Sequence, residues 1–106
     1  MKDLRISMLG DIYGGLLTEK QRDMLRDYFD YDLSLGEIAE QCGISRQAVA
    51  DSVKTVEKTL CRYEETLKLA ESRESLRKQV LSIVGSLDEG DSDKALQAAK
   101  QLLAEL

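Results

Sequence analysis

Apolar residues recur every three or four positions along most of this chain, which is the spacing of amphipathic α-helices. The sequence contains no proline and no run of alternating β-branched residues, so the pattern predicts an all-α fold. The first predicted helix spans residues 2–13 and is ended by two consecutive glycines, Gly14 and Gly15. Its expected core-facing residues are Leu4, Met8 and Ile12, with Leu9 and Tyr13 beside them.

A second helix is predicted to begin after Thr18, because threonine is a favourable helix-capping residue. Gln21, three positions later, completes a capping box. The apolar face of this helix is expected to comprise Met24, Leu25, Tyr28 and Phe29.

The most distinctive stretch of the chain follows, between residues 33 and 60. Ser34 and Glu37 form another capping box, which predicts a helix over residues 35–42. Gly43 suits the left-handed conformation found at helix ends. Ser45 can cap the next helix. Two helices joined by so short a turn must cross steeply, and this predicts a helix-turn-helix supported by the preceding helix.

The helix after Ser45 shows a heptad pattern that outlasts an ordinary recognition helix. After a polar interruption over residues 71–75, the same spacing returns at Leu76, Val80, Ile83 and Leu87. This seam either packs within one chain or joins two chains. A homodimer is attractive, since paired helix-turn-helix modules read two half-sites. The residues expected in the dimer or packing seam are Val56, Leu60, Tyr63 and Leu67, which continue the spacing set by Val49 and Val53.

A last helix is predicted over residues 94–105, capped by Asp91 or Ser92 and packed against the helix of residues 76–87. The expected organisation is therefore a helix-turn-helix domain over residues 1–69 and a C-terminal helical extension over residues 70–106.

The charge of the chain changes this picture, because basic patches supply most of the affinity for nucleic-acid phosphates. The net charge is −5. By segment it is −2 for residues 1–33, −1 for residues 34–70 and −2 for residues 71–106. No third of the chain is basic, so any nucleic-acid surface must be a local patch.

The composition argues against an enzyme. The chain has no histidine, so neither a Ser-His nor a Cys-His pair can form. Two cysteines, Cys42 and Cys61, do not make a metal site, and no phosphate-binding glycine loop is present. We expect no cofactor. The sequence shows no signal peptide and no membrane-inserting segment, which predicts a cytoplasmic protein with free thiols.

Candidate nucleic-acid contacts lie on the helix after Ser45, since a recognition helix reads the major groove with its first turns. Arg46 can pair with guanine or phosphate, and Gln47 can pair with adenine. Asp51 opposes binding, because its carboxylate repels phosphate. Alternatively, these charges form solvated pairs within the helix. The full candidate set is Arg46, Gln47, Ala50, Asp51, Lys54 and Lys58.

These residues carry a resemblance to known proteins. The stretch DLSLGEIAEQCGISRQAVADSVKTVEKTL resembles region four of bacterial sigma factors, with valine or isoleucine and leucine at the places of Val49, Val53 and Leu60. The ordered motifs LLTEKQRDMLRDYF, DLSLGEIAE and SRQAV are similar to the YlxM family of small helix-turn-helix proteins. The resemblance covers about residues 4–69. That family often carries a bulky aromatic residue at the place of Ala50.

The resemblance implies a DNA-binding regulatory protein that takes part in the signal recognition particle pathway, because the family's gene lies beside those of the particle's protein and receptor. The alternative is an interaction module that binds a signal recognition particle protein or RNA and needs no DNA.

Overall fold

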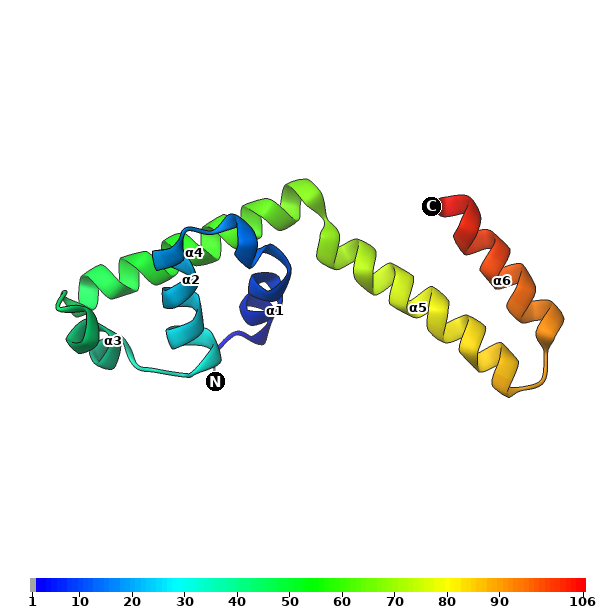
Figure 1. Ribbon diagram of the computed structural model, residues 1–106, viewed down its shortest axis with the longest axis horizontal. Helices are drawn as coiled ribbons and strands as arrows, with labels where there is room; N and C mark the ends of the chain where they lie inside the picture. The colour runs from blue at the N-terminus through cyan, green and yellow to red at the C-terminus, as the bar shows by residue number, and fades with distance from the viewer. Residues whose placement is uncertain (1) are drawn as a thin grey trace. The chain divides into compact units, whose positions relative to one another are not determined.

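The computed structural model describes residues 2–106, which form helices and contain no β-strand (Figure 1). The all-α fold with a helix-turn-helix and a long following helix is confirmed. The chain divides into two compact units, Met1–Lys68 and Leu69–Leu106. No helix among the described residues is both long and apolar enough to cross a membrane. The α-helices are α1 (Leu4–Tyr13), α2 (Glu19–Leu25), α3 (Leu35–Cys42), α4 (Arg46–Leu67), α5 (Leu69–Asp88) and α6 (Ser92–Glu105).

Side-chain caps set the helix boundaries in the first unit. Thr18 and Gln21 form the expected capping box at α2, and Arg26–Asp30 extends that helix as a π-helical turn. At α3, the Glu37 amide donates to Ser34 Oγ over 3.0 Å, and the Ser34 amide donates to Glu37 Oε1 over 3.2 Å. Both capping boxes predicted from the sequence are therefore confirmed.

The turn between α3 and α4 also has the predicted geometry. Gly43 adopts the left-handed conformation, with φ at 68°. Ser45 Oγ then accepts from the Ala48 amide over 3.0 Å and caps α4. Only two residues, Ile44 and Ser45, separate Gly43 from the first residue of α4, so the two helices meet at a tight corner.

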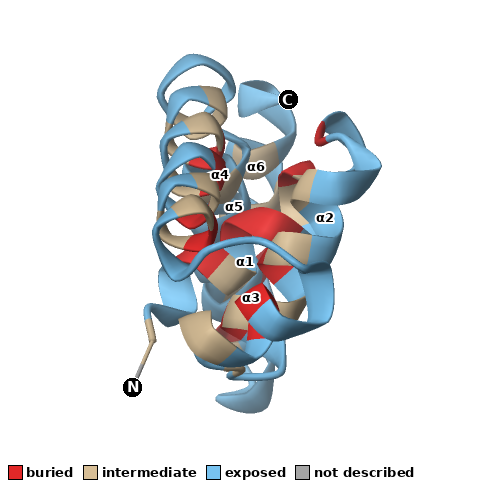
Figure 2. Ribbon diagram, turned by 90° about the vertical axis from the view of Figure 1, so that its left-hand side faces the viewer, coloured by how far each residue is buried: buried red, intermediate tan, exposed pale blue. Residues whose placement is uncertain are grey.

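The core of the first unit is built around one stripe of α4. Val49, Val53, Val56 and Leu60 are all buried, and α4 packs against α1, α2 and α3. Figure 2 shows buried positions where these helices face one another. The other buried apolar residues of the unit are Ile6, Leu9, Tyr13, Leu17, Leu25, Phe29, Ile38 and Ala39.

The predicted core face of α1 is partly wrong. The helix begins at Leu4, after an Asp3 cap, and Leu4 and Met8 are exposed. Leu9 and Tyr13 are buried as expected, together with Ile6, which the spacing argument passed over. The helix carries apolar residues on two faces, so periodicity alone does not identify the inner one. Contact with α4 and the π-helical turn selects it.

Aromatic contacts hold the C-terminal half of α4. The Tyr63 ring lies 5.9 Å from the Tyr13 ring, between centroids. Tyr63 donates a 3.4 Å hydrogen bond to the Leu16 carbonyl, and Tyr13 donates a 2.5 Å bond to Glu64 Oε1. The intrachain packing of α4 therefore reaches Tyr63, whereas Leu67 is exposed.

The helical pattern breaks earlier than the sequence predicts. Lys68 adopts a left-handed conformation, with φ at 53°, and α5 begins at once at Leu69. Residues 71–75, expected as the interruption, lie inside α5. Glutamate and arginine are good helix formers, so this polar run continues as an exposed helix.

The second unit is a pair of helices, α5 and α6, which pack side by side (Figure 1). Residues 89–91 connect them, with Gly90 at φ 79° and the Asp91 side chain accepting from the Lys94 amide. The last helix begins at Ser92, two residues before the expected start. Its predicted packing against the preceding helix is confirmed.

Gly10 of α1 lies close to the Leu25 side chain of α2. A Cβ atom on Gly10 would lie 2.4 Å from Leu25 Cδ2, and Leu25 is buried. Gly14 has right-handed helical angles and open space around its Cβ position. Gly10→Ala should therefore be less stable than the matched control Gly14→Ala by about 1–3 kcal/mol, the cost of overpacking. Urea denaturation followed by circular dichroism measures the difference, and equal stabilities would contradict the tight α1–α2 contact.

The cap of α4 gives a second prediction. Ser45→Ala removes the acceptor for the Ala48 amide and should cost about 1 kcal/mol of unfolding free energy. Ser52→Ala serves as control, because Ser52 lies inside α4, where alanine is the better helix former. Both variants are compared with the parent by thermal unfolding. A Ser45→Ala protein as stable as Ser52→Ala would show that the cap contributes nothing.

Candidate nucleic-acid interface

The helix-turn-helix holds the two sides of α4 in different environments. Ile38 of α3 and Val49 of α4 are both fully buried, which fixes the inner side of the recognition helix. The opposite side faces solvent from Arg46 onward. Five of the six candidate residues are exposed and Ala50 is half-buried. At about 100° per residue, Gln47, Asp51, Lys54 and Lys58 lie on the side of α4 turned away from the buried stripe, whereas Arg46 and Ala50 lie on the flank between the two sides.

Arg46 lies back against the first helix of the motif. A Cβ atom on Gly36 would come within 3.1 Å of Arg46 Nε and 3.2 Å of its Nη2 atom. The guanidinium therefore covers the first turn of α3 without an ion pair among the described residues. The absence of a side chain at Gly36 leaves room for this arrangement.

Gln47 and Asp51 are paired with each other. The Gln47 amide donates a 2.9 Å hydrogen bond to Asp51 Oδ1 across one helical turn. Asp51 also accepts from Thr55 through its backbone carbonyl, over 3.0 Å. The amide of Gln47, the candidate contact to adenine, is therefore hydrogen bonded to the Asp51 carboxylate, which would repel phosphate.

A row of basic residues extends along the same side of the helix. Lys54 and Lys58 are exposed, and Arg62 continues the row one turn later. None of the three forms an ion pair within the part of the chain that the structure describes. Arg62 was missed in the sequence analysis, which stopped at Lys58. The repeat of four residues from Lys54 was the signal that could have found it.

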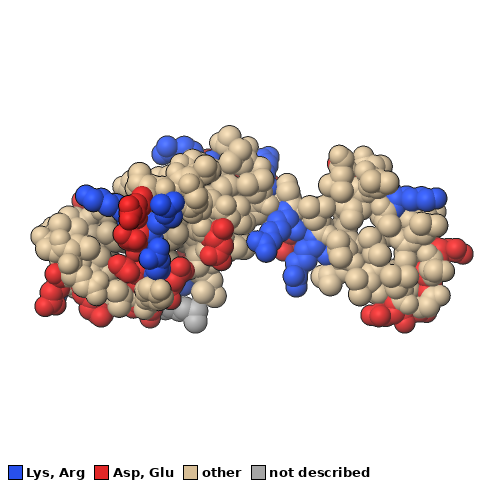
Figure 3. Space-filling model, viewed as in Figure 1, with Lys and Arg blue, Asp and Glu red and all other residues tan. Residues whose placement is uncertain are grey.

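The charge of the first unit is mixed rather than of one sign. Figure 3 shows lysine and arginine interspersed with aspartate and glutamate over the face in view. The row of Lys54, Lys58 and Arg62 is therefore a local feature of an acidic protein. Its three cations are spaced along one helix, which suits successive phosphates on a nucleic-acid backbone.

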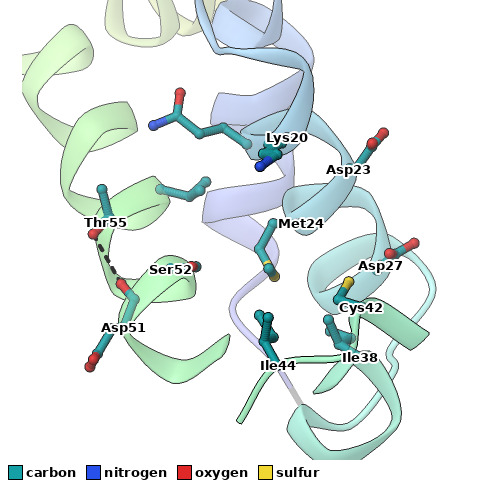
Figure 4. A pocket seen from close by; sticks show the side chains of 12 residues that line it. Lys20, Asp23, Met24, Asp27, Ile38, Cys42, Ile44, Asp51, Ser52 and Thr55 are labelled. Atoms are coloured by element: carbon teal, nitrogen blue, oxygen red, sulfur yellow. Dashed lines mark hydrogen bonds between the residues drawn. The ribbon is translucent and has the colours of Figure 1, made fainter. Parts of the chain in front are cut away.

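A cleft of about 550 Å³ lies between α2, α3 and α4, and none of the three basic residues of the row lines it (Figure 4). Met24 and Ile44 point toward its interior, and the carboxylates of Asp23 and Asp27 point outward at its edge. The Asp51 carboxylate is directed away from the cleft. The lining residues are Lys20, Gln21, Asp23, Met24, Asp27, Ile38, Cys42, Ile44, Asp51, Ser52, Thr55 and Val56.

The residues of the predicted seam are placed differently from one another. Val56 and Leu60 are buried in the core of the first unit, and Tyr63 packs on Tyr13. Leu67 is exposed. Most of this seam is therefore occupied by contacts within the chain.

The two cysteines do not form a disulfide. Cys42 and Cys61 are free thiols. The guanidinium of Arg5 donates to Cys61 Sγ over 3.9 Å. Within residues 2–106, no group of three or more histidine, cysteine, aspartate or glutamate side chains is arranged to hold a metal ion.

Comparison with known proteins places this fold in a family. A family model described as "Putative helix-turn-helix protein, YlxM / p13 like" matches residues 1–102. A UPF0122 protein of Desulforamulus reducens is 40% identical over 105 residues, covering 96% of this chain and 90% of the relative. One from Clostridium kluyveri is 46% identical over 91 residues, covering 86% and 82%. The chain therefore belongs to the UPF0122 family of YlxM / p13-like helix-turn-helix proteins.

Proposed function

We propose that this protein is a DNA-binding regulator that contacts nucleic acid through the exposed side of α4. The observation that carries the proposal is the row of Lys54, Lys58 and Arg62, exposed on the second helix of a helix-turn-helix. The proposal includes a cytoplasmic, non-enzymatic homodimer, because paired modules read two half-sites.

The proposed contacts are of two kinds: contacts to phosphates, which position the helix, and contacts to bases, which read the sequence. Lys54, Lys58 and Arg62 are suited to phosphates, which fix the position of the helix on a duplex. Arg46 and Gln47 are the base-reading candidates, with Ala50 between them and the basic row. For Gln47 to contact a base, its side-chain amide must first break its hydrogen bond to the Asp51 carboxylate.

The phosphate contacts make this binding dependent on ionic strength, because each contact releases counterions from the nucleic acid. The phosphate contacts must act against a net charge of −5. Three phosphate contacts correspond to a slope of roughly −2.7 in a plot of log K against log salt concentration. We expect measurable affinity at low salt and a steep loss as salt is added.

Replacing Lys54 and Lys58 by alanine tests whether the exposed side of α4 binds DNA. The double variant should bind duplex DNA more weakly, and its salt slope should be smaller by about 1 for each lost phosphate contact. Arg46→Ala combined with Lys54→Ala should also weaken binding, but the slope should be smaller by about 1 only, because Lys54 is the phosphate contact of that pair. Lys78→Ala with Lys94→Ala is the control, since it removes the same charge from exposed sites outside α4. Fluorescence anisotropy over a range of salt concentrations measures both quantities.

Two outcomes of this comparison would overturn the assignment. Binding equal to that of the parent at every salt concentration would exclude the exposed side of α4. Equal weakening by the control pair would show that total charge, rather than this row, determines affinity.

A second candidate function rests on the acidic surface and the cleft beside α4. An apolar interior edged by Asp23 and Asp27 favours a basic protein, which fits an interaction module for the signal recognition particle. The family resemblance adds the genetic neighbourhood of that pathway. In this alternative the particle's protein or RNA is the partner, and DNA is not required.

Pull-down of the purified particle components with and without nuclease separates the two functions. The second candidate predicts a nuclease-resistant complex with the particle's protein. It also predicts that Asp27→Lys lowers recovery several-fold, whereas Asp93→Lys on α6 does not. Release of all partners by nuclease would contradict direct protein binding. Equal recovery with Asp27→Lys and Asp93→Lys would exclude the cleft.

A further inference from the structure

The pair formed by α5 and α6 leaves much of its apolar surface uncovered. Val80 and Val84 of α5 are each 47% exposed, and Leu103 of α6 is 73% exposed. The buried residues of this unit are Ser86 and Ala95. Six of the uncovered apolar residues are Leu76, Val80, Val84, Leu87, Leu96 and Leu103.

These residues share one face of the pair. At about 100° per residue, the stripe of Leu76, Val80, Val84 and Leu87 lies roughly a quarter turn from the side of α5 that meets α6. Leu96 and Leu103 lie at the same offset on α6. Because the two helices are antiparallel, equal offsets place both stripes on the same side. We call this set of six residues the hairpin face.

A two-helix unit of this size needs a further layer to cover such a face. Residues 69–106 form a separate compact unit of fewer than about 40 residues, a size at which domains usually need oligomerisation or another stabilising element. Apolar helix faces are stable when they pack against another layer. We propose that the hairpin face binds the hairpin face of a second copy, forming an antiparallel four-helix bundle.

The charges of the pair support a second copy and select its orientation. Arg73 and Arg77 lie near the start of α5, whereas Asp88 and Glu89 lie at the turn to α6. None of the four has an ion-pair partner among the described residues. With Glu71, Glu74 and Lys78 counted, residues 71–78 carry a net charge of +1 and residues 88–94 carry −3. Each copy therefore offers a weakly basic end and an acidic end.

Two two-fold arrangements bring the hairpin faces together. One places like ends together, with Arg73 and Arg77 facing the same residues of the second copy. The other places α5 antiparallel over α5 of the second copy, so that these arginines meet Asp88 and Glu89. The second arrangement pairs opposite charges at both ends of an isologous interface, and it is the one we assign.

This inference deepens the homodimer included in the proposed function and relocates its interface. Val56 and Leu60 of the heptad seam are 1% and 0% exposed within one chain, so they cannot also join two chains without opening the core. The hairpin face requires no such opening. The association is measured without nucleic acid, so it and the DNA-binding proposal can fail separately.

Analytical ultracentrifugation of the full chain tests the face. The parent should sediment as a dimer at micromolar concentration. Val80→Glu with Val84→Glu places charges in the centre of the interface and should raise the dimer dissociation constant by more than about a hundredfold. Leu81→Glu is the control, because Leu81 is 55% exposed on another side of α5 and should leave the dimer intact. Circular dichroism checks that each variant remains helical.

Charge reversal tests the orientation. Arg73→Glu with Arg77→Glu should weaken the dimer by about tenfold through like-charge contacts. Adding Asp88→Lys and Glu89→Lys to that variant should restore the affinity of the dimer. A monomeric parent, or a dimer that survives Val80→Glu with Val84→Glu, would overturn the interface. If the variant with all four substitutions does not regain dimer affinity, the antiparallel arrangement is wrong.

Discussion

The first unit depends on the burial of one stripe of α4. Val49, Val53, Val56 and Leu60 are buried where α4 packs against α1, α2 and α3, so this one helix contacts the three other α-helices of the unit. Burying an aliphatic side chain contributes about 1.5–3 kcal/mol relative to exposure. Because the stripe fixes the rotation of α4, it also decides which residues of that helix face solvent.

The outer side of α4 follows directly from this constraint. With the valines inside, Lys54, Lys58 and Arg62 must project outward along one row. The same rotation presents Asp51 beside them, where it accepts the Gln47 amide. The helix therefore exposes a row of three cations in a protein that is acidic overall. The candidate base-reading side chains, Gln47 and Arg46, are engaged in local contacts with Asp51 and Gly36.

Features controlled by neighbouring residues could be predicted from the sequence. The capping boxes at Thr18 and Ser34 and the left-handed Gly43 each involve a few consecutive residues, and the structure contains all of them. The inner face of α1 could not be predicted, since its apolar residues occupy two faces and contact with α4 decides between them. The break at Lys68 likewise lacks a glycine or proline signal. The side-chain positions of Arg46 and Gln47 depend on Gly36 and Asp51, which periodicity does not reveal.

The most direct test of the claim that the exposed side of α4 contacts nucleic acid is a chemical-shift titration. Backbone amides of the full chain, labelled with ¹⁵N, are followed while duplex DNA is added at low salt. We predict shifts concentrated between Arg46 and Arg62, reversed when salt is raised. Shifts confined to α5 and α6, or no shifts at saturating DNA, would contradict it.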